Sequence, residues 1–143
     1  MAASKADGQA EFVKQLKALG VDVSRETLAR LEAYAALLVK WQAKINLVGP
    51  ATLPDLWRRH FLDSAQLLPL LPSGPGILVD LGSGAGFPGL VLALMTEWRV
   101  HLVDSDQRKC AFLRQVALET GVNTRVAIHA QRFADVPAYK ADI

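Results

Sequence analysis

Cysteine is almost absent from this sequence, since Cys110 is the only one among its 143 residues. A single cysteine excludes an internal disulfide framework of the kind that staples small secreted proteins, and it fits a reducing cytoplasm. The sequence also lacks an apolar run long enough to cross a membrane, and its first five residues, Met1–Lys5, lead into polar residues. We therefore expect a cytoplasmic protein with no signal peptide, no transmembrane helix and no membrane partner.

A strong excess of charge of one sign is also missing. Sixteen basic residues face fourteen acidic ones, so the net charge of +2 permits an RNA partner without demanding one. The side chains that bind metals most readily are sparse, and His101, His129 and Cys110 have no metal-ligand spacing, so we expect no metal. With 51% hydrophobic and 21% charged residues, the chain has the composition of an ordinary globular domain.

Glycine, by contrast, is concentrated in one stretch. The apolar run Ile77–Val79 predicts a buried strand, and Asp80 follows at its carboxyl end. Three glycines then alternate with other residues, at Gly82, Gly84 and Gly86. Pro88 suits the first turn of a helix, where its missing N–H costs nothing. A strand, a glycine loop and a helix in this order predict a nucleotide-binding α/β unit, with loop amides and a helix N-terminus at the ligand.

The spacing of the glycines narrows the class of ligand. The third glycine of a dinucleotide fingerprint would fall on Phe87, and no lysine followed by serine or threonine makes a P-loop. The pattern of an acid followed by alternating glycines resembles the first motif of S-adenosyl-L-methionine-dependent methyltransferases with a Rossmann-like fold. The residues that this motif assigns to the cofactor are Asp80, Gly82, Ser83, Gly84, Gly86 and Phe87. The alternative is a glycine-rich turn without a ligand.

A second acid closes the next predicted strand. Val100–Val103 predicts a strand, and Asp104 ends it, 24 residues after Asp80. An acid at this point of a nucleotide-binding unit accepts hydrogen bonds from ribose hydroxyls. The alternative is that Asp104 caps the next helix together with Ser105 and Asp106.

Alternating helical and strand patterns predict the fold class. We expect an α/β protein with a parallel sheet and right-handed crossovers, in which residues 74–143 form a Rossmann-like core and residues 1–73 an N-terminal helical extension. The expected helices are 9–19, 24–43, 52–62 with a capping box of Thr52 and Asp55, 65–71, 90–95 and 106–120; the expected later strands are 125–128 and the beginning of a fourth in 138–143. Three strands and the start of a fourth leave an open sheet, so we expect the intact protein to continue beyond Ile143.

Five runs of residues resemble one bacterial family. They are Lys44-Ile45-Asn46-Leu47, Arg59-His60-Phe61-Leu62-Asp63-Ser64, the glycine stretch Val79–Gly89, Leu102-Val103-Asp104-Ser105 and Lys109–Arg114. Together they resemble the small-subunit (16S) ribosomal RNA guanine-N7 methyltransferases, also called the glucose-inhibited division protein B family. The glycine motif alone indicates only a methyltransferase. The Arg-His-x-x-Asp-Ser run at its distance from Gly-Phe-Pro-Gly makes the resemblance specific.

The resemblance implies a cytoplasmic, monomeric enzyme that transfers a methyl group from S-adenosyl-L-methionine to N7 of a guanine in 16S ribosomal RNA, free or in the small subunit. Carried over by position, Gly82 and Phe87 contact the cofactor, Asp104 binds its ribose, and Phe133 and Ala134 lie on the adenine side. Two alternatives remain open: a methyltransferase of the same fold acting on another substrate, and a cofactor-binding fragment without catalysis. A nicotinamide oxidoreductase is disfavoured by Phe87.

The RNA side is less defined by the sequence. Asn46, Arg59 and His60 are the candidates for substrate contacts. Against this, Asn46 suits a turn, and His60 is equally suited to a pair with Asp63 three residues later on one helical face. Trp41 and Trp57 are expected in the core. No catalytic residue is assigned, because guanine N7 carries a lone pair and no proton, so the reaction needs alignment more than a base.

Overall fold

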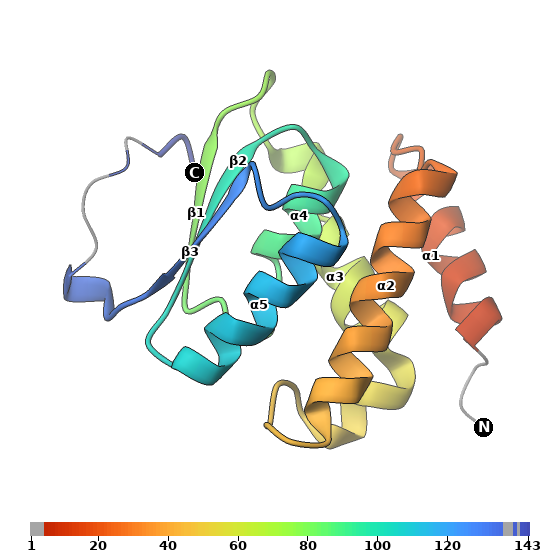
Figure 1. Ribbon diagram of the computed structural model, residues 1–143. Helices are drawn as coiled ribbons and strands as arrows, with labels where there is room; N and C mark the ends of the chain where they lie inside the picture. Colours follow the sequence, from red (N-terminus) through yellow and green to blue (C-terminus); the bar gives the residue numbers. More distant parts are fainter. Residues whose placement is uncertain (1–4, 136–138, 140) are drawn as a thin grey trace.

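The computed structural model describes residues 5–135, 139 and 141–143, and it shows a parallel sheet with helices stacked on one face (Figure 1). The α-helices are α1 (Lys5–Ala18), α2 (Arg25–Gln42), α3 (Asp63–Ala65), α4 (Gly89–Met95) and α5 (Gln107–Glu119). The strands are β1 (Ile77–Leu81), β2 (Arg99–Asp104) and β3 (Val126–Ala130). Shorter helical segments are η1 (Pro50–Asp55), η2 (Trp57–Leu62), η3 (Leu68–Leu70) and η4 (Phe133–Asp135).

The three strands pair in the order β1-β2-β3, all parallel, with α4 and α5 as the crossovers. Asp80 in β1 lies beside Leu102, and Asp104 at the end of β2 lies beside Ala130. The carboxyl ends of all three strands therefore meet at one edge of the sheet. This arrangement confirms the predicted α/β fold with a Rossmann-like strand–helix alternation.

The outer side of β1 is paired as well. The Asp142 amide donates to the Ile77 carbonyl at 2.8 Å, and the Val79 amide donates to the Ile143 carbonyl at 2.9 Å. The Asp142 carboxylate also accepts from the Ile77 amide at 2.8 Å. The last residues thus begin a further ladder beside β1, as the sequence predicts for 138–143; positions 138 and 140 lie outside the described residues.

The helices build outward from the sheet in layers (Figure 1). Helices α4 and α5 cover one face of the sheet, α2 packs against both of them, and α1 packs against η2. One apolar cluster continues through these layers, from Phe12 in α1 through Tyr34 in α2 to Leu102 in β2. The boundary predicted between residues 73 and 74 stays a prediction, and this cluster extends to both sides of it.

Local sequence signals explain where helices α2 and α5 begin. Ser24 caps α2 by accepting a hydrogen bond from the Thr27 amide at 3.1 Å, as expected for a serine before a helix. Asp106 caps α5 by accepting from the Arg108 and Lys109 amides at 2.9 and 3.2 Å. The predicted bounds of both helices are confirmed to within one residue.

The predicted capping box at Thr52 and Asp55 is wrong. The Thr52 hydroxyl donates to the Gly49 carbonyl at 2.7 Å, and the Asp55 carboxylate pairs with Arg58. Instead of one α-helix over 52–62, the chain forms a 3-10 helix and then the π-helix η2. Pro54 explains part of this, because a proline inside a helix has no amide to donate and crowds the preceding turn.

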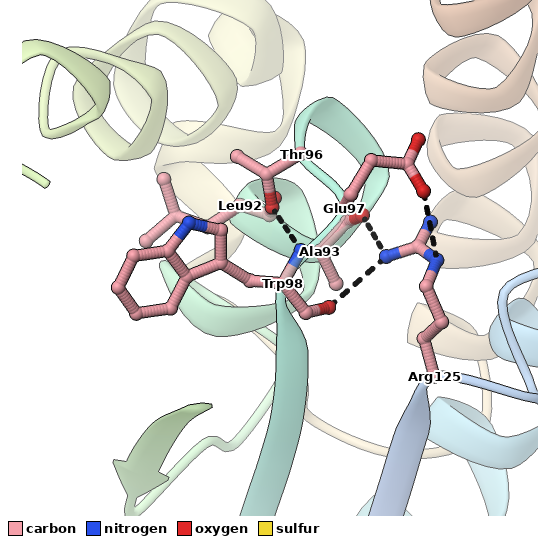
Figure 2. Close-up of polar contacts among 6 residues, drawn as sticks. All are labelled: Leu92, Ala93, Thr96, Glu97, Trp98 and Arg125. Atoms are coloured by element: carbon pink, nitrogen blue, oxygen red, sulfur yellow. Dashed lines mark hydrogen bonds and ion pairs between the residues drawn. The ribbon is translucent and has the colours of Figure 1, made fainter. Parts of the chain in front are cut away.

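At the amino edge of the sheet, Arg125 joins three segments of chain (Figure 2). Its guanidinium donates to the carbonyls of Ala93 and Trp98 at 3.0 and 3.1 Å, while the Glu97 carboxylate lies 4.0 Å away. The Thr96 hydroxyl accepts from the Trp98 amide at 3.2 Å in the same turn. Arg125 thus closes the turn between α4 and β2 from the start of β3.

Two histidines share the face of the sheet that carries no helix. His101 Nδ1 lies 3.0 Å from His129 Nε2, and the Tyr139 hydroxyl lies 3.2 Å from His129 Nδ1. The Tyr139 ring stacks on His101 with ring centroids 4.0 Å apart. Among the described residues, no group of three or more His, Cys, Asp or Glu side chains is arranged to hold a metal ion. The contacts of His101 and His129 with Tyr139 hold the Tyr139 ring against the sheet.

This histidine pair should make stability depend on pH. Burial lowers the pKa of both His101 and His129. The charges of His129 and Arg99 lower the pKa of His101 further, and that of Arg114 lowers the pKa of His129 further. A group whose pKa is lower in the folded than in the unfolded chain takes up protons on unfolding. The contribution of such a histidine to stability is complete above its ordinary pKa of about 6.5. It is lost as the pH falls through the pKa that the histidine has in the folded chain.

We expect the free energy of unfolding in urea to be lower at pH 5 than at pH 7.5, and His129→Gln to reduce this difference. Part of the difference should remain in the variant, because burial also lowers the pKa of His60. An unchanged difference between the two pH values in His129→Gln would contradict the assignment to the pair.

Candidate functional site

The carboxyl edge of the sheet brings Asp104 against the glycine loop that joins β1 to α4. Asp104 Oδ2 accepts a hydrogen bond from the Gly84 amide at 2.9 Å, and Oδ1 accepts from the Asp106 amide at 2.8 Å. The side chain is half-buried. Asp106, not Asp104, caps α5, so helix capping does not account for Asp104. Each carboxylate oxygen keeps a second lone pair with which it can accept from a ligand.

The backbone amides of the loop turn inward. The Gly82 and Ser83 amides both donate to the Val103 carbonyl, at 2.8 and 3.0 Å, and the Gly86 amide donates to the Ser83 carbonyl at 2.7 Å. The expectation that loop amides face a ligand is therefore wrong for these positions. A pyrophosphate is bound by several free amides at such a loop, so this geometry disfavours a dinucleotide.

Asp80 holds the start of α4 instead of facing outward. Its Oδ2 accepts from the Gly89 amide at 3.0 Å, and its carbonyl accepts from the buried Ser83 hydroxyl at 2.9 Å. Burial raises the pKa of the Asp80 carboxyl, and the charge of Asp104 contributes to the same direction. A Cβ added to Gly89 would lie 2.6 Å from both Asp80 Oδ2 and Leu102 Cδ2, so the start of α4 lies too close to the strands for any side chain at this position.

Phe133 lies over the glycine loop from the segment after β3. Its ring would lie 3.3 Å from a Cβ on Gly82, and 57% of the side chain is exposed. The neighbouring Gln131 amide donates to the Asp104 carbonyl at 3.1 Å. The side-chain oxygen Oε1 of Gln131 is buried and accepts no hydrogen bond from the described part of the chain. Gln131 thus borders Asp104 and Phe133 borders Gly82, with Ala134 exposed beside them.

Phe87 is held between two rings from the helical part of the chain. Its ring stacks on Tyr34, with centroids 5.5 Å apart and an interplanar angle of 8°, and on His60, at 4.8 Å and 21°. The Tyr34 hydroxyl donates to the Ala85 carbonyl of the same loop at 2.5 Å. Tyr34 is a site residue that the sequence did not reveal, because its position indicates only the apolar face of a helix.

His60 does not form the predicted pair with Asp63. Its Nε2 lies 2.7 Å from the Thr52 oxygen, and the Thr52 hydroxyl already donates its proton to Gly49. His60 must therefore be the donor, which places its proton on Nε2. Burial is the main cause that lowers the pKa of His60, followed by the charge of Arg59. The structure brings the His60 ring against Phe87, beside the glycine loop.

The other two candidates for RNA contacts, Asn46 and Arg59, lie outside the group formed by Phe87, Tyr34 and His60. Arg59 is exposed, and the Asn46 side chain accepts from Gln42 Nε2 at 3.2 Å on the surface, as a turn residue does. The Lys44 carbonyl accepts from the Arg108 guanidinium at 3.1 Å, so the turn that carries Asn46 lies beside the start of α5. Within the described part of the chain, no hydrogen bond or ion pair joins Asn46 or Arg59 to the glycine loop.

The two tryptophans are core residues, as expected. Trp57 is buried and packs edge-on against Phe12 and Phe61, with ring centroids 5.3 and 4.8 Å apart. Trp41 is half-buried and packs edge-on against Phe112 at 5.7 Å. Trp57 is thus enclosed in the core, whereas part of Trp41 remains exposed.

A parallel sheet with a glycine loop after its first strand, joined to an acid at the end of the second, defines a Rossmann-like fold of the methyltransferase class. A family model described as rRNA small subunit methyltransferase G matches residues 27–142. This chain belongs to that family, GidB. In general, methyltransferases use S-adenosyl-L-methionine.

Relatives with the family's name are closely similar in sequence. The ribosomal RNA small subunit methyltransferase G of Paramagnetospirillum magneticum is 64% identical over 121 residues, which are 85% of this chain and 58% of the relative. The protein of the same name from Rhodospirillum rubrum is 59% identical over 126 residues, 88% of this chain and 62% of the relative. That from Rhodospirillum centenum is 62% identical over 120 residues, 84% of this chain and 55% of the relative. The chain thus spans little more than half the length of these relatives.

None of the described helices is long and apolar enough to cross a membrane.

Proposed function

We propose that the carboxyl edge of the sheet binds S-adenosyl-L-methionine, and that the protein transfers its methyl group to N7 of a guanine in 16S ribosomal RNA. The observation that carries the cofactor proposal is the contact between Asp104 and the glycine loop. It gives a carboxylate with spare lone pairs at the end of β2, where a nucleoside's ribose hydroxyls are bound in this class of fold. The class of reaction follows from the family.

The residues around Asp104 fit an adenosine without a phosphate. The exposed Phe133 ring offers a surface for a base to stack on. The Gly82 and Ser83 amides are satisfied within the protein, which suits a cofactor that has no pyrophosphate. Of the predicted cofactor residues, Asp80, Ser83 and Gly86 support the loop from within, while Asp104, Gly84, Gly82 and Phe133 border the space above it.

The bound cofactor supplies an electrophilic methyl group on a sulfonium. Guanine N7 needs no base to remove a proton, so these residues act by holding the donor at a fixed place, and no side chain is assigned a proton transfer. The Asp104 side chain would lie near the positive donor at the proposed site. Arg59 and Asn46, exposed beside the segments that contact the loop, remain our candidates for contacts to RNA.

We also propose that the protein acts in the cytoplasm as a monomer, with 16S ribosomal RNA or the small ribosomal subunit as its partner. The names of the relatives and the sparse cysteine content support this proposal.

Isothermal titration of the chain with S-adenosyl-L-methionine tests the cofactor proposal, with NAD as the control ligand and circular dichroism as the check of folding. We expect micromolar binding of the first ligand and none of the second. Transfer of labelled methyl from the cofactor to 30S subunits that lack this modification, but not to intact modified subunits, tests the reaction. A folded chain that binds NAD and not S-adenosyl-L-methionine would overturn the proposal.

A further inference from the structure

The glycine loop is hydrogen-bonded to a residue of the helical part of the chain, which lies outside the glycine motif. Tyr34, in the middle of α2, is fully buried, and its hydroxyl donates to the carbonyl of Ala85, 51 residues away. Ala85 is itself buried between two glycines. A buried carbonyl without a donor is costly, so this hydrogen bond favours one conformation of the loop.

The space next to Tyr34 leaves the loop no freedom to move toward the helix. A Cβ added to Gly86 would clash with the Tyr34 hydroxyl oxygen, and it would lie 2.9 Å from Leu90 Cβ and 3.1 Å from Leu113 Cδ2. Gly86 has φ +98°, a conformation that side chains rarely adopt. The backbone of the loop therefore lies directly against the hydroxyl that it accepts from.

The ring of Tyr34 fixes the other end of the loop. Phe87 stacks on both Tyr34 and His60, and His60 is held in turn by Thr52. Burial, together with the charge of Asp80, raises the pKa of Tyr34 well above its ordinary value, so the hydroxyl keeps its proton and remains a donor. Tyr34 thus contacts the loop twice, once through its hydroxyl and once through its ring.

We propose that Tyr34 is a positioning residue of the cofactor site: α2 sets the conformation of the glycine loop through Tyr34, and thereby the affinity of the loop for the cofactor. This inference rests on the proposed function in so far as it names S-adenosyl-L-methionine as the ligand. It makes the N-terminal helical part of the chain a component of the cofactor site and not only a surface for RNA.

Tyr34→Phe tests the proposal, because it keeps the ring between α2 and Phe87 and removes only the hydroxyl. We expect the affinity for S-adenosyl-L-methionine, measured by titration on the folded protein, to fall about tenfold. Phe12→Leu is the matched control. Phe12 is also fully buried, but its ring packs on Trp57 and not on Phe87, so its truncation should lower stability without changing the affinity. An unchanged affinity in Tyr34→Phe, or an equal loss in Phe12→Leu, would overturn the proposal.

Amide hydrogen exchange without any ligand separates this inference from the proposed function. In Tyr34→Phe we expect the Gly84 and Gly86 amides to exchange about tenfold faster than in the wild type, while the amides of α1 keep their rates. If the wild type binds no S-adenosyl-L-methionine but the loop amides of the variant exchange faster, the proposed function fails and the anchoring role stands. Wild-type exchange rates in the variant loop would overturn the anchoring role.

Discussion

Replacing Asp104 with alanine is expected to weaken the binding of S-adenosyl-L-methionine at least about a hundredfold. The substitution removes the carboxylate proposed for the ribose hydroxyls and also the acceptor of the Gly84 and Asp106 amides. Each hydrogen bond to a charged group contributes roughly 1.5–3 kcal/mol, and about 2.7 kcal/mol corresponds to a hundredfold change in affinity. Isothermal titration of the variant measures the effect directly.

Asp106→Ala provides the control for Asp104→Ala. Asp106 lies two residues away and is exposed, and it caps α5 through the Arg108 and Lys109 amides. Losing this cap should cost about 1 kcal/mol of stability and leave the affinity for the cofactor close to that of the wild type. If the two variants bind equally well, the ribose assignment of Asp104 is wrong.

The largest expected effect on stability comes from Gly86→Ala. A side chain in a left-handed conformation costs roughly 1–2 kcal/mol, and forcing a methyl group into filled space typically costs about 1–3 kcal/mol more. At Gly86 both costs apply, because φ is +98° and the methyl group would meet Tyr34 and Leu90. We expect the free energy of unfolding in urea to fall by about 3 kcal/mol or more.

Gly20→Ala separates the two costs. Gly20 follows α1 with φ +83°, and no atom lies within 4 Å of an added Cβ, so only the conformational cost applies. The variant should lose about 1–2 kcal/mol. A loss in Gly86→Ala no greater than in Gly20→Ala would show that the loop has room beside α2.

The contact between Asp104 and the glycine loop could be anticipated from the sequence. Parallel strands joined by helices place their carboxyl ends at one edge, so residues that end successive strands become neighbours whatever their side chains. The same reasoning gave the bounds of β1, β2 and α5 to within two residues. This reasoning depends only on the hydrophobic periodicity of each segment and on the alternation of strands and helices, both of which can be read from the sequence.

Contacts between layers could not be anticipated in the same way. Tyr34 reads as one more residue on the apolar face of α2, because nothing in the spacing of that face indicates which loop lies opposite. Gln131 stands in an ordinary exposed-looking segment, and only the packing after β3 buries its side-chain oxygen. The Thr52 capping box failed for a related reason: His60 and Gly49 compete for the hydroxyl and win once the chain is folded.

Arg125 has a consequence for the order in which the chain folds. Its two acceptors, the carbonyls of Ala93 and Trp98, precede it by 32 and 27 residues, and they belong to the turn that ends the first crossover. That turn therefore completes its hydrogen bonding only when β3 has docked. The two crossovers should open and close as one cooperative unit, because neither can keep the guanidinium bonds without the other. The edge of the sheet farthest from the glycine loop thus ties the first crossover to the second.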